Sequence, residues 1–130
     1  TNLLLNFLAL EKAKKSDALE ALLIDEEGNI REGTRSNFFV VKGNIIFTPP
    51  KEKALEGVTK KLIIASTKGK FSVIEKDIAL TDIREYEEHF ISSTSMNVMP
   101  IRQIDNLELN ISFPKIRYIQ KLFKEYVKRY

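Results

Sequence analysis

Cysteine and tryptophan are absent from this 130-residue sequence, and histidine occurs only once. Without cysteine the chain forms no disulfide framework, no thiolate metal site and no thiol nucleophile, and a single histidine argues against a structural zinc site. No run of apolar residues reaches the roughly 18 that a membrane-spanning helix requires, so we expect no membrane partner. The missing cysteines agree with a reducing, cytoplasmic setting.

The composition that remains is that of an ordinary globular domain. Hydrophobic residues make up 43% and charged residues 30% of the 15.0 kDa chain, which excludes a disordered or a fibrous protein. A chain of this length forms one domain and buries roughly two-thirds of its extended surface without covalent staples. The net charge of +3 is too small to indicate a nucleic-acid partner.

The spacing of apolar residues predicts an α/β domain with a mixed sheet. Helices are expected over 2–15, 58–67 and from Pro114 onward, where apolar residues recur every three or four positions. A further helix start is expected at 80–82, with Thr81 as its cap. Short apolar runs predict strands at 21–24, 36–41, 45–47, 71–75, 89–91 and 98–104, with turns at 25–29 and 43–44. Few connections resemble βαβ units, so we expect strands running in both directions.

Three polar stretches stand where predicted elements begin or end. Residues 31–37 place a glutamate, a glycine and small polar side chains just before an aromatic strand, which suits the close approach of a flat ligand. Gly57, Val58 and Thr59 open a helix, and the free backbone N–H groups of a helix start bind anions. Residues 92–95 read Ser-Ser-Thr-Ser after a strand, a hydroxyl-rich turn that can cradle phosphate or carboxylate.

Each stretch taken alone also has a plainer explanation. The first is an exposed loop capped by Asn37, the second an ordinary helix cap and the third an inert serine loop. We expect His89, within an apolar run, to be a partly buried packing residue, and residues 84–88 to be a solvated helix end. No Ser-His-Asp or paired-carboxylate arrangement follows from the spacing.

The order of these stretches carries more information than any one of them. The first block of the succession consists of ALLID at 21–25, Gly28 and EGTRSNFF at 32–39. The second consists of TPP at 48–50 and LEGVT at 55–59. The third consists of FISSTS at 90–95, MPI at 99–101 and ID at 104–105. This succession resembles the class IV aminotransferases, the fold-type IV pyridoxal-phosphate enzymes, from residue 2 to about 126. The family includes branched-chain and D-amino-acid aminotransferases and aminodeoxychorismate lyases. The resemblance implies a mixed-sheet pseudo-barrel flanked by helices, the larger domain of those enzymes.

The resemblance also implies pyridoxal 5′-phosphate as the cofactor and assigns roles by position. Glu32 matches the carboxylate that keeps the ring nitrogen protonated, so that the ring can accept electrons. The residues matched to cofactor binding are Glu32, Leu55, Gly57, Val58, Thr59, Ser93 and Thr94. The residues matched to the other side of the cofactor and to the substrate carboxylate are Thr34, Arg35, Ser36, Ser95 and Met96.

The catalytic lysine of the family pattern has no counterpart in this chain. The Schiff-base lysine is expected about two residues before Thr1, and Lys12, Lys14 and Lys15 match nothing catalytic. We therefore expect residues 1–130 to be the C-terminal, cofactor-cradling domain, without the N-terminal small domain, and to be inactive alone. The intact enzyme is expected to be a cytoplasmic homodimer that transfers an amino group between a branched-chain or D-amino acid and a 2-oxo acid.

Two other functions remain open at this stage. The first is an aminodeoxychorismate lyase on the same scaffold, which uses the same lysine and carboxylate. The second is a non-catalytic basic interaction domain, based on cations that interleave with the apolar stripe of the last helix: Lys115, Arg117, Lys121, Lys124, Lys128 and Arg129. A helix with one buried and one solvated face explains these charges equally well.

Overall fold

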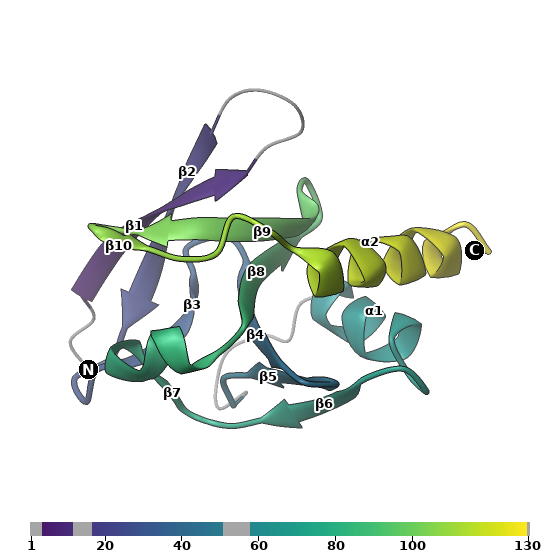
Figure 1. The fold of residues 1–130 in the computed structure, drawn as a ribbon, viewed down its shortest axis with the longest axis horizontal. Helices are drawn as coiled ribbons and strands as arrows, with labels where there is room; N and C mark the ends of the chain where they lie inside the picture. Colours follow the sequence, from purple (N-terminus) through teal and green to yellow (C-terminus); the bar gives the residue numbers. More distant parts are fainter. Residues whose placement is uncertain (1–3, 12–16, 51–57, 130) are drawn as a thin grey trace.

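The computed structural model describes residues 4–11, 17–50 and 58–129 (Figure 1). Within these ranges the chain forms a 10-stranded sheet and two α-helices. The strands are β1 (Leu4–Glu11), β2 (Asp17–Ile24), β3 (Asn29–Gly33), β4 (Asn37–Lys42), β5 (Ile45–Thr48), β6 (Ser72–Glu75), β7 (Ile78–Ala79), β8 (Glu88–Ser93), β9 (Asn97–Ile104) and β10 (Leu107–Glu108). The helices are α1 (Val58–Ser66) and α2 (Pro114–Val127), with a 3₁₀ helix, η1 (Leu80–Glu85).

The strands follow the order β6-β5-β4-β8-β9-β1-β2-β3-β7, and β10 pairs with β9. All pairs are antiparallel except β5 with β6, which is parallel. The expected mixed sheet is therefore confirmed. The sheet curls, because β3 and β4 contact each other although four strands separate them in the sheet order. Helices α1 and α2 contact each other and pack against β8, and α2 also packs against β9 (Figure 1).

The predicted helix over 2–15 is wrong where the structure describes it, because Leu4–Glu11 is strand β1. Leucine and alanine favour helices, but β1 gains a full ladder to β2 and a second one to β9, and such pairing overrides local propensity. Leu8 and Leu10 are buried two positions apart, which is the period of a strand. Residues 12–15 of that prediction lie outside the described residues.

The other expected strands all fall on observed strands, although β2 begins four residues earlier than predicted, at Asp17. Strands β3, β7 and β10 were not predicted. Strand β3 lies in a segment that the sequence indicated as a turn and a loop, since Asn29–Gly33 is polar. Its backbone is nevertheless paired on both sides, with β2 and with β7.

The helices predicted over 58–67 and from Pro114 onward are confirmed as α1 and α2. Helix α2 begins at Pro114, the first helical position where proline is well tolerated, and it buries Ile116, Ile119 and Phe123 along one face. The predicted entry at 80–82 is η1, but its cap position is Ala79 and no side chain caps it, so Thr81 is not the cap.

The prediction that residues 84–88 are a solvated helix end fails at Glu88. This residue opens β8 and is only 3% exposed. Its carboxylate accepts hydrogen bonds from the backbone N–H groups of Lys115 (3.0 Å) and Ile116 (2.7 Å). Since no side chain at Phe113 caps α2, the carboxylate of a distant strand satisfies the orphan donors of that helix start.

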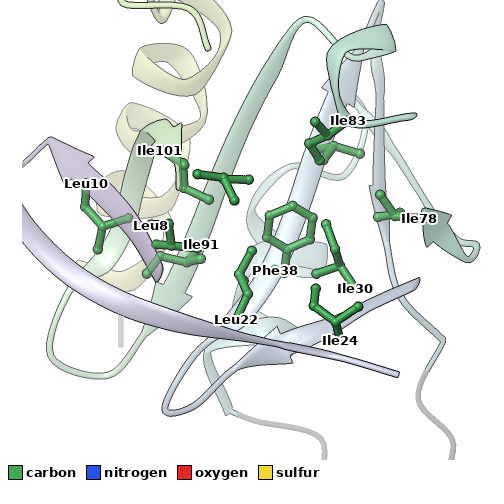
Figure 2. Close-up of a cluster of buried hydrophobic side chains, with 12 residues drawn as sticks. Leu8, Leu10, Leu22, Ile24, Ile30, Phe38, Ile78, Ile83, Ile91 and Ile101 are labelled. Carbon is green, nitrogen blue, oxygen red and sulfur yellow. The ribbon is translucent and has the colours of Figure 1, made fainter. Parts of the chain in front are cut away.

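Apolar side chains form two clusters, one on each face of the curled sheet. The first fills the inside of the curl, where Leu22, Ile30 and Phe38 point toward one another (Figure 2). The second joins the sheet to the two helices and includes Phe39 stacked on Phe90, with ring centroids 4.7 Å apart. No helix in the described part of the chain is long and apolar enough to span a membrane.

Candidate functional site

The three polar stretches singled out in the sequence converge on one cavity of about 280 Å³, called here the hollow. They come from the end of β3 and the start of β4, from the first turn of α1, and from the end of β8. The lining residues are Glu32, Gly33, Thr34, Arg35, Ser36, Asn37, Val58, Thr59, Ser92, Ser93 and Thr94. Strand pairing accounts for part of this convergence, because Asn37 lies opposite Ser92 in the ladder of β4 and β8. Leu55 and Gly57 lie outside the described residues.

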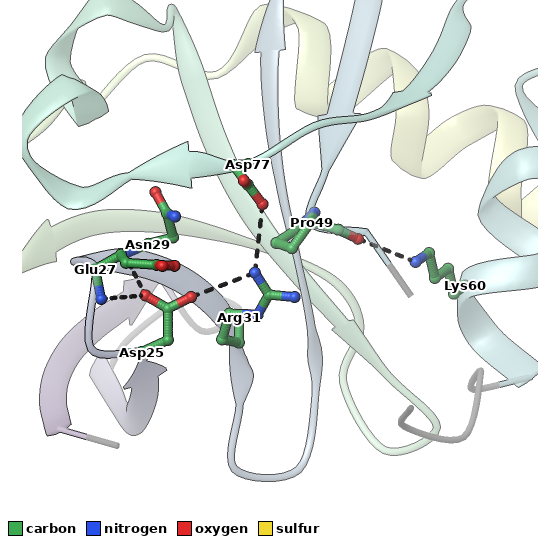
Figure 3. A network of polar contacts seen from close by, with 7 residues as sticks. All are labelled: Asp25, Glu27, Asn29, Arg31, Pro49, Lys60 and Asp77. Carbon is green, nitrogen blue, oxygen red and sulfur yellow. Dashed lines mark hydrogen bonds and ion pairs between the residues drawn. The ribbon is translucent and has the colours of Figure 1, made fainter. Parts of the chain in front are cut away.

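Strand β3 holds Glu32 at the hollow, and its neighbour Arg31 fixes the strand in place. The Arg31 guanidinium lies 3.4 Å from the carboxylates of both Asp25 and Asp77 (Figure 3). Asp25 Oδ1 also accepts hydrogen bonds of 2.9 Å from the backbone N–H groups of Glu27 and Asn29, which closes the turn before β3. Successive side chains of a strand face opposite ways, so the polar network of Arg31 leaves the Glu32 carboxylate available to the hollow.

The first turn of α1 contributes backbone donors. The first N–H groups of a helix have no partner within the helix and carry the positive end of its dipole, and no acidic residue stands in this first turn. Thr59 is buried whereas Val58 is 67% exposed. The next residue, Lys60, is buried and places Nζ 3.5 Å from the Pro49 carbonyl (Figure 3) and 3.5 Å from the Glu75 carboxylate. These contacts fasten the helix start to the ends of β5 and β6.

The end of β8 contributes hydroxyl groups that differ in their burial and in their hydrogen bonds. The Ser93 hydroxyl accepts a 3.0 Å hydrogen bond from the backbone N–H of Met96 and lies 3.4 Å from that of Ser95. Thr94 is exposed in the turn that follows. Ser92 is fully buried, and its Oγ has no hydrogen-bond partner in the described part of the chain.

Two of the predicted substrate-lining residues do not line the hollow. Ser95 turns back toward Ser93. Met96 packs against the inner apolar cluster and lines a separate groove of about 680 Å³ between β9 and α2. The structure therefore gathers Thr34, Arg35 and Ser36 with the cofactor candidates and leaves Ser95 and Met96 at the margin.

Arg35 is the only cationic side chain that lines the hollow within the described residues. Its side chain is exposed. A guanidinium at the mouth of a cavity that also contains helix N–H groups favours an anionic ligand. The Glu32 carboxylate in the same cavity favours a ligand that also carries a proton donor or a positive charge. The hollow thus suits a ligand with both features.

His89 has the structural role expected from its apolar surroundings. It is 2% exposed, and its Nε2–H donates a 2.7 Å hydrogen bond to the Ile83 carbonyl. Burial lowers the pKa of His89 to about 4, which the bond to Ile83 only partly opposes. The ring is therefore neutral at physiological pH and fastens η1 to β8. It lines a different cavity from the hollow.

Sequence reasoning missed one charged residue beside the hollow, Glu20. This residue is 7% exposed and its carboxylate is hydrogen-bonded to the turn that follows β3. The signal was present in the sequence, because Glu20 stands two and four positions before Leu22 and Ile24. Had β2 been predicted over its full length, alternation would have placed this glutamate on the same buried face.

Comparison with known proteins adds independent information. The family model described as amino-transferase class IV matches residues 1–104. D-alanine aminotransferase from Listeria monocytogenes is 39% identical over 110 residues, which cover 83% of this chain and 38% of that protein. The crystal structure of the Escherichia coli branched-chain amino acid aminotransferase superposes with a TM-score of 0.74 at 31% identity, covering 82% of this chain and 37% of that chain.

A third similar protein was solved with a ligand. The aminotransferase from Brucella abortus bound to the cofactor PLP (pyridoxal 5′-phosphate) has a TM-score of 0.70 at 30% identity, over 80% of this chain and 38% of that chain. In each comparison, the chain thus spans well under half the length of the protein it resembles.

Proposed function

This chain belongs to the class IV aminotransferases, and from that premise we propose that the hollow is the cofactor cradle of an enzyme that transfers amino groups with pyridoxal 5′-phosphate. The observation that carries the proposal is the meeting of Glu32, the first turn of α1 and Thr94 in one cavity. These groups come from three segments far apart in the chain, and each offers what one part of the cofactor requires.

Pyridoxal phosphate, when bound, supplies a ring that withdraws electrons from the substrate's α-carbon. The Glu32 carboxylate accepts a hydrogen bond from the ring nitrogen and holds the proton there. The backbone N–H groups of Val58 and Thr59 and the hydroxyl of Thr94 donate to the phosphate. Leu55, Gly57 and Ser93 complete the proposed set.

The substrate side of the hollow is proposed to be the turn after β3. Arg35 faces the carboxylate shared by an amino acid and a 2-oxo acid, and Thr34 and Ser36 line the same edge. We assign Ser95 and Met96 to the outer margin of this substrate region. The names of the similar proteins support a branched-chain or a D-amino acid as the donor.

We further propose that the chain is the C-terminal, cofactor-cradling domain of the enzyme, and that the Schiff-base lysine and the smaller N-terminal domain complete the site. The chain covers only 37–38% of the length of the similar proteins, which supports the proposal that further parts complete the site. The intact protein is proposed to be a cytoplasmic homodimer. Among the described residues that line the hollow, none favours the lyase reaction over transamination.

The structure gives the basic face of α2 an ordinary explanation. Arg117 pairs with Glu11 at 2.8 Å, and Lys115 pairs with Glu87 and donates to the Gly43 carbonyl. Two of its cations therefore tie α2 to the sheet. We therefore do not propose a basic interaction domain as a second function.

Binding of pyridoxamine 5′-phosphate to the chain tests the proposal. This amine form of the cofactor cannot form imines with surface lysines, so its binding reports the hollow alone. The test compares pyridoxamine with its phosphate ester by NMR titration. We expect Thr94→Val to weaken only the ester, and Glu32→Gln to weaken both by roughly tenfold, the loss of one charge-assisted hydrogen bond. A lower pKa of the bound ring nitrogen should accompany Glu32→Gln.

Matched exposed residues provide the controls. Thr81 and Glu85, both exposed on η1, should tolerate Thr81→Val and Glu85→Gln with unchanged binding. Equal affinity of the native chain for the two ligands would refute the phosphate cradle. An unchanged ring-nitrogen pKa in Glu32→Gln would refute the assignment of that carboxylate.

A further inference from the structure

We propose that Glu20 is a positioning residue, which fixes the turn at residues 33–36 so that this turn can present Arg35 to the ligand. The inference rests on the proposed function of the hollow. It states that Glu20, which does not line the hollow, determines the geometry of the hollow's substrate side. Glu20 belongs to β2 and is absent from the lining of the hollow. Any effect it has on binding must therefore pass through the turn.

The Glu20 carboxylate is shared among several donors of that turn. Its Oε1 accepts a 2.7 Å hydrogen bond from the Thr34 hydroxyl. Its Oε2 accepts hydrogen bonds from the backbone N–H of Arg35 (3.3 Å) and from the Ser36 hydroxyl (3.2 Å). Three consecutive residues are thus tied to one side chain. A buried carboxylate with this many donors holds them more firmly than a neutral acceptor would.

The carboxylate replaces a strand partner that the sheet does not supply. Pairing of β2 with β3 ends where Leu22 lies opposite Gly33. One more backbone bond follows, from Thr34 N–H to the Ala21 carbonyl at 3.0 Å. Beyond it the chain turns away, and Arg35 N–H would have no acceptor on β2. Glu20, the next residue along β2, supplies that acceptor with its side chain.

Gly33 shows that the turn is built around this contact. A Cβ at Gly33 would overlap the Ser36 hydroxyl and would stand 3.2 Å from Glu20 Oε2. The backbone bond from Gly33 N–H to the Ser36 carbonyl, 2.9 Å, closes the same turn. Only a residue without a side chain leaves room for the carboxylate and the hydroxyl together.

This arrangement decides which groups of the turn can bind an anion. An ionised carboxylate only accepts hydrogen bonds, so the hydroxyl protons of Thr34 and Ser36 are both committed to Glu20. Toward a ligand these two hydroxyls can only accept. Arg35 is then the residue of the turn whose side chain can donate to a substrate carboxylate, whereas Thr34 and Ser36 suit an N–H or O–H group of the ligand.

Paired substitutions at two buried glutamates test the inference. Glu20→Ala and the milder Glu20→Gln are compared with Glu88→Ala and Glu88→Gln. Glu88 is also buried and also accepts hydrogen bonds from backbone N–H groups, but its donors lie in the first turn of α2 and not in the turn at residues 33–36. The readouts are backbone amide hydrogen exchange of Arg35 and Ile116, and the affinity for pyridoxamine 5′-phosphate.

We expect Glu20→Ala to speed exchange at Arg35 by roughly tenfold, the loss of one hydrogen bond, and to leave Ile116 unchanged. Glu88→Ala should show the reverse pattern. Affinity should fall roughly tenfold in Glu20→Ala, and less in Glu20→Gln, which keeps one acceptor oxygen. In both Glu88 variants affinity should equal that of the native chain. If Glu20→Ala does not fold, Glu20→Gln decides by the same readouts.

The outcomes separate this inference from the function of the hollow. Unchanged exchange at Arg35 in the folded Glu20 variants overturns the positioning role, whether or not the ligand binds. Faster exchange with unchanged affinity overturns it as well, since the turn would then not matter to binding. If the native chain binds no ligand, the proposed function fails while the exchange pattern still reports the role of Glu20 in the turn.

Discussion

Glu88 accepts a 2.7 Å hydrogen bond from the backbone N–H of Ile116, and so a carboxylate at the start of β8 caps a helix that begins 26 positions later. The same carboxylate accepts a second bond from the N–H of Lys115. Strand β8 ends at the hollow. The helix packed on the outside of the sheet and the polar edge of the cavity are therefore attached to one strand.

Glu88→Ala should destabilise the fold substantially. The substitution leaves two helix N–H groups without acceptors, one of them at a buried residue, and we expect a loss of about 2 kcal/mol in the free energy of unfolding. Urea denaturation followed by circular dichroism measures it. Glu85→Gln, at an exposed position without a contact of this kind to any described residue, serves as the control and should lie within about 0.5 kcal/mol of the native chain. An equally small change in Glu88→Ala would contradict the capping role.

His89 should make the stability of the fold dependent on pH in the mildly acidic range. Its pKa is lowered from the ordinary 6.5 to about 4, chiefly because burial disfavours the charged ring. Between these values the unfolded chain binds a proton that the folded chain excludes, so stability is complete above pH 6.5 and falls as the pH drops toward 4. The full loss is on the order of 3 kcal/mol.

Denaturation midpoints measured between pH 5 and 7 test this dependence. His89→Gln removes the titrating ring but retains an N–H donor for the Ile83 carbonyl. The variant should lose most of the slope between pH 5 and 7, even if it is less stable overall. A native chain and a variant with parallel pH profiles would show that His89 does not set this dependence.

Gly33 and Gly28 should respond differently to alanine. A Cβ at Gly33 would overlap the Ser36 hydroxyl, whereas a Cβ at Gly28 meets nothing within 4 Å, although its φ of +87° strains any other residue. We expect Gly33→Ala to weaken pyridoxamine 5′-phosphate roughly tenfold or more by displacing the turn. Gly28→Ala should cost about 1 kcal/mol of stability and leave affinity unchanged. Equal effects on binding would argue against a special role for the turn.

The sequence was sufficient to predict elements whose signals are local. Helix α2 combines an initial proline with a long apolar stripe, and the turn at Gly43 lies between two apolar runs, so both were recognised from their own residues. Residues 31–37, 57–59 and 92–95 are candidates from sequence because glycine, threonine and serine stand at the ends of predicted elements. Their meeting in one hollow follows from the pairing of β4 with β8 and from the packing of α1.

What the sequence did not reveal depends on partners distant in the chain. Strand β1 has the leucine and alanine content of a helix and extends only because β2 and β9 pair with it. Glu20 and Glu88 look like surface charges until the donors that surround them are known. Glu88 accepts hydrogen bonds from backbone N–H groups of α2, and Glu20 accepts them from hydroxyl and N–H groups of the turn after β3. The residues adjacent to each glutamate in sequence do not identify these donors.

The chain alone should not catalyse transamination. Within the described residues no lysine lines the hollow. Lys60, the residue after the lining residue Thr59, is buried and directs its amino group to Pro49 and Glu75. Moving a proton between a substrate carbon and a bound cofactor requires a base in reach of both, and the described lining offers no amine. Turnover of amino acid and 2-oxo acid with added pyridoxal phosphate should therefore equal that of free pyridoxal phosphate. Faster turnover that disappears in Lys60→Arg would mean that this lysine reaches the hollow and that the site is complete without a further domain.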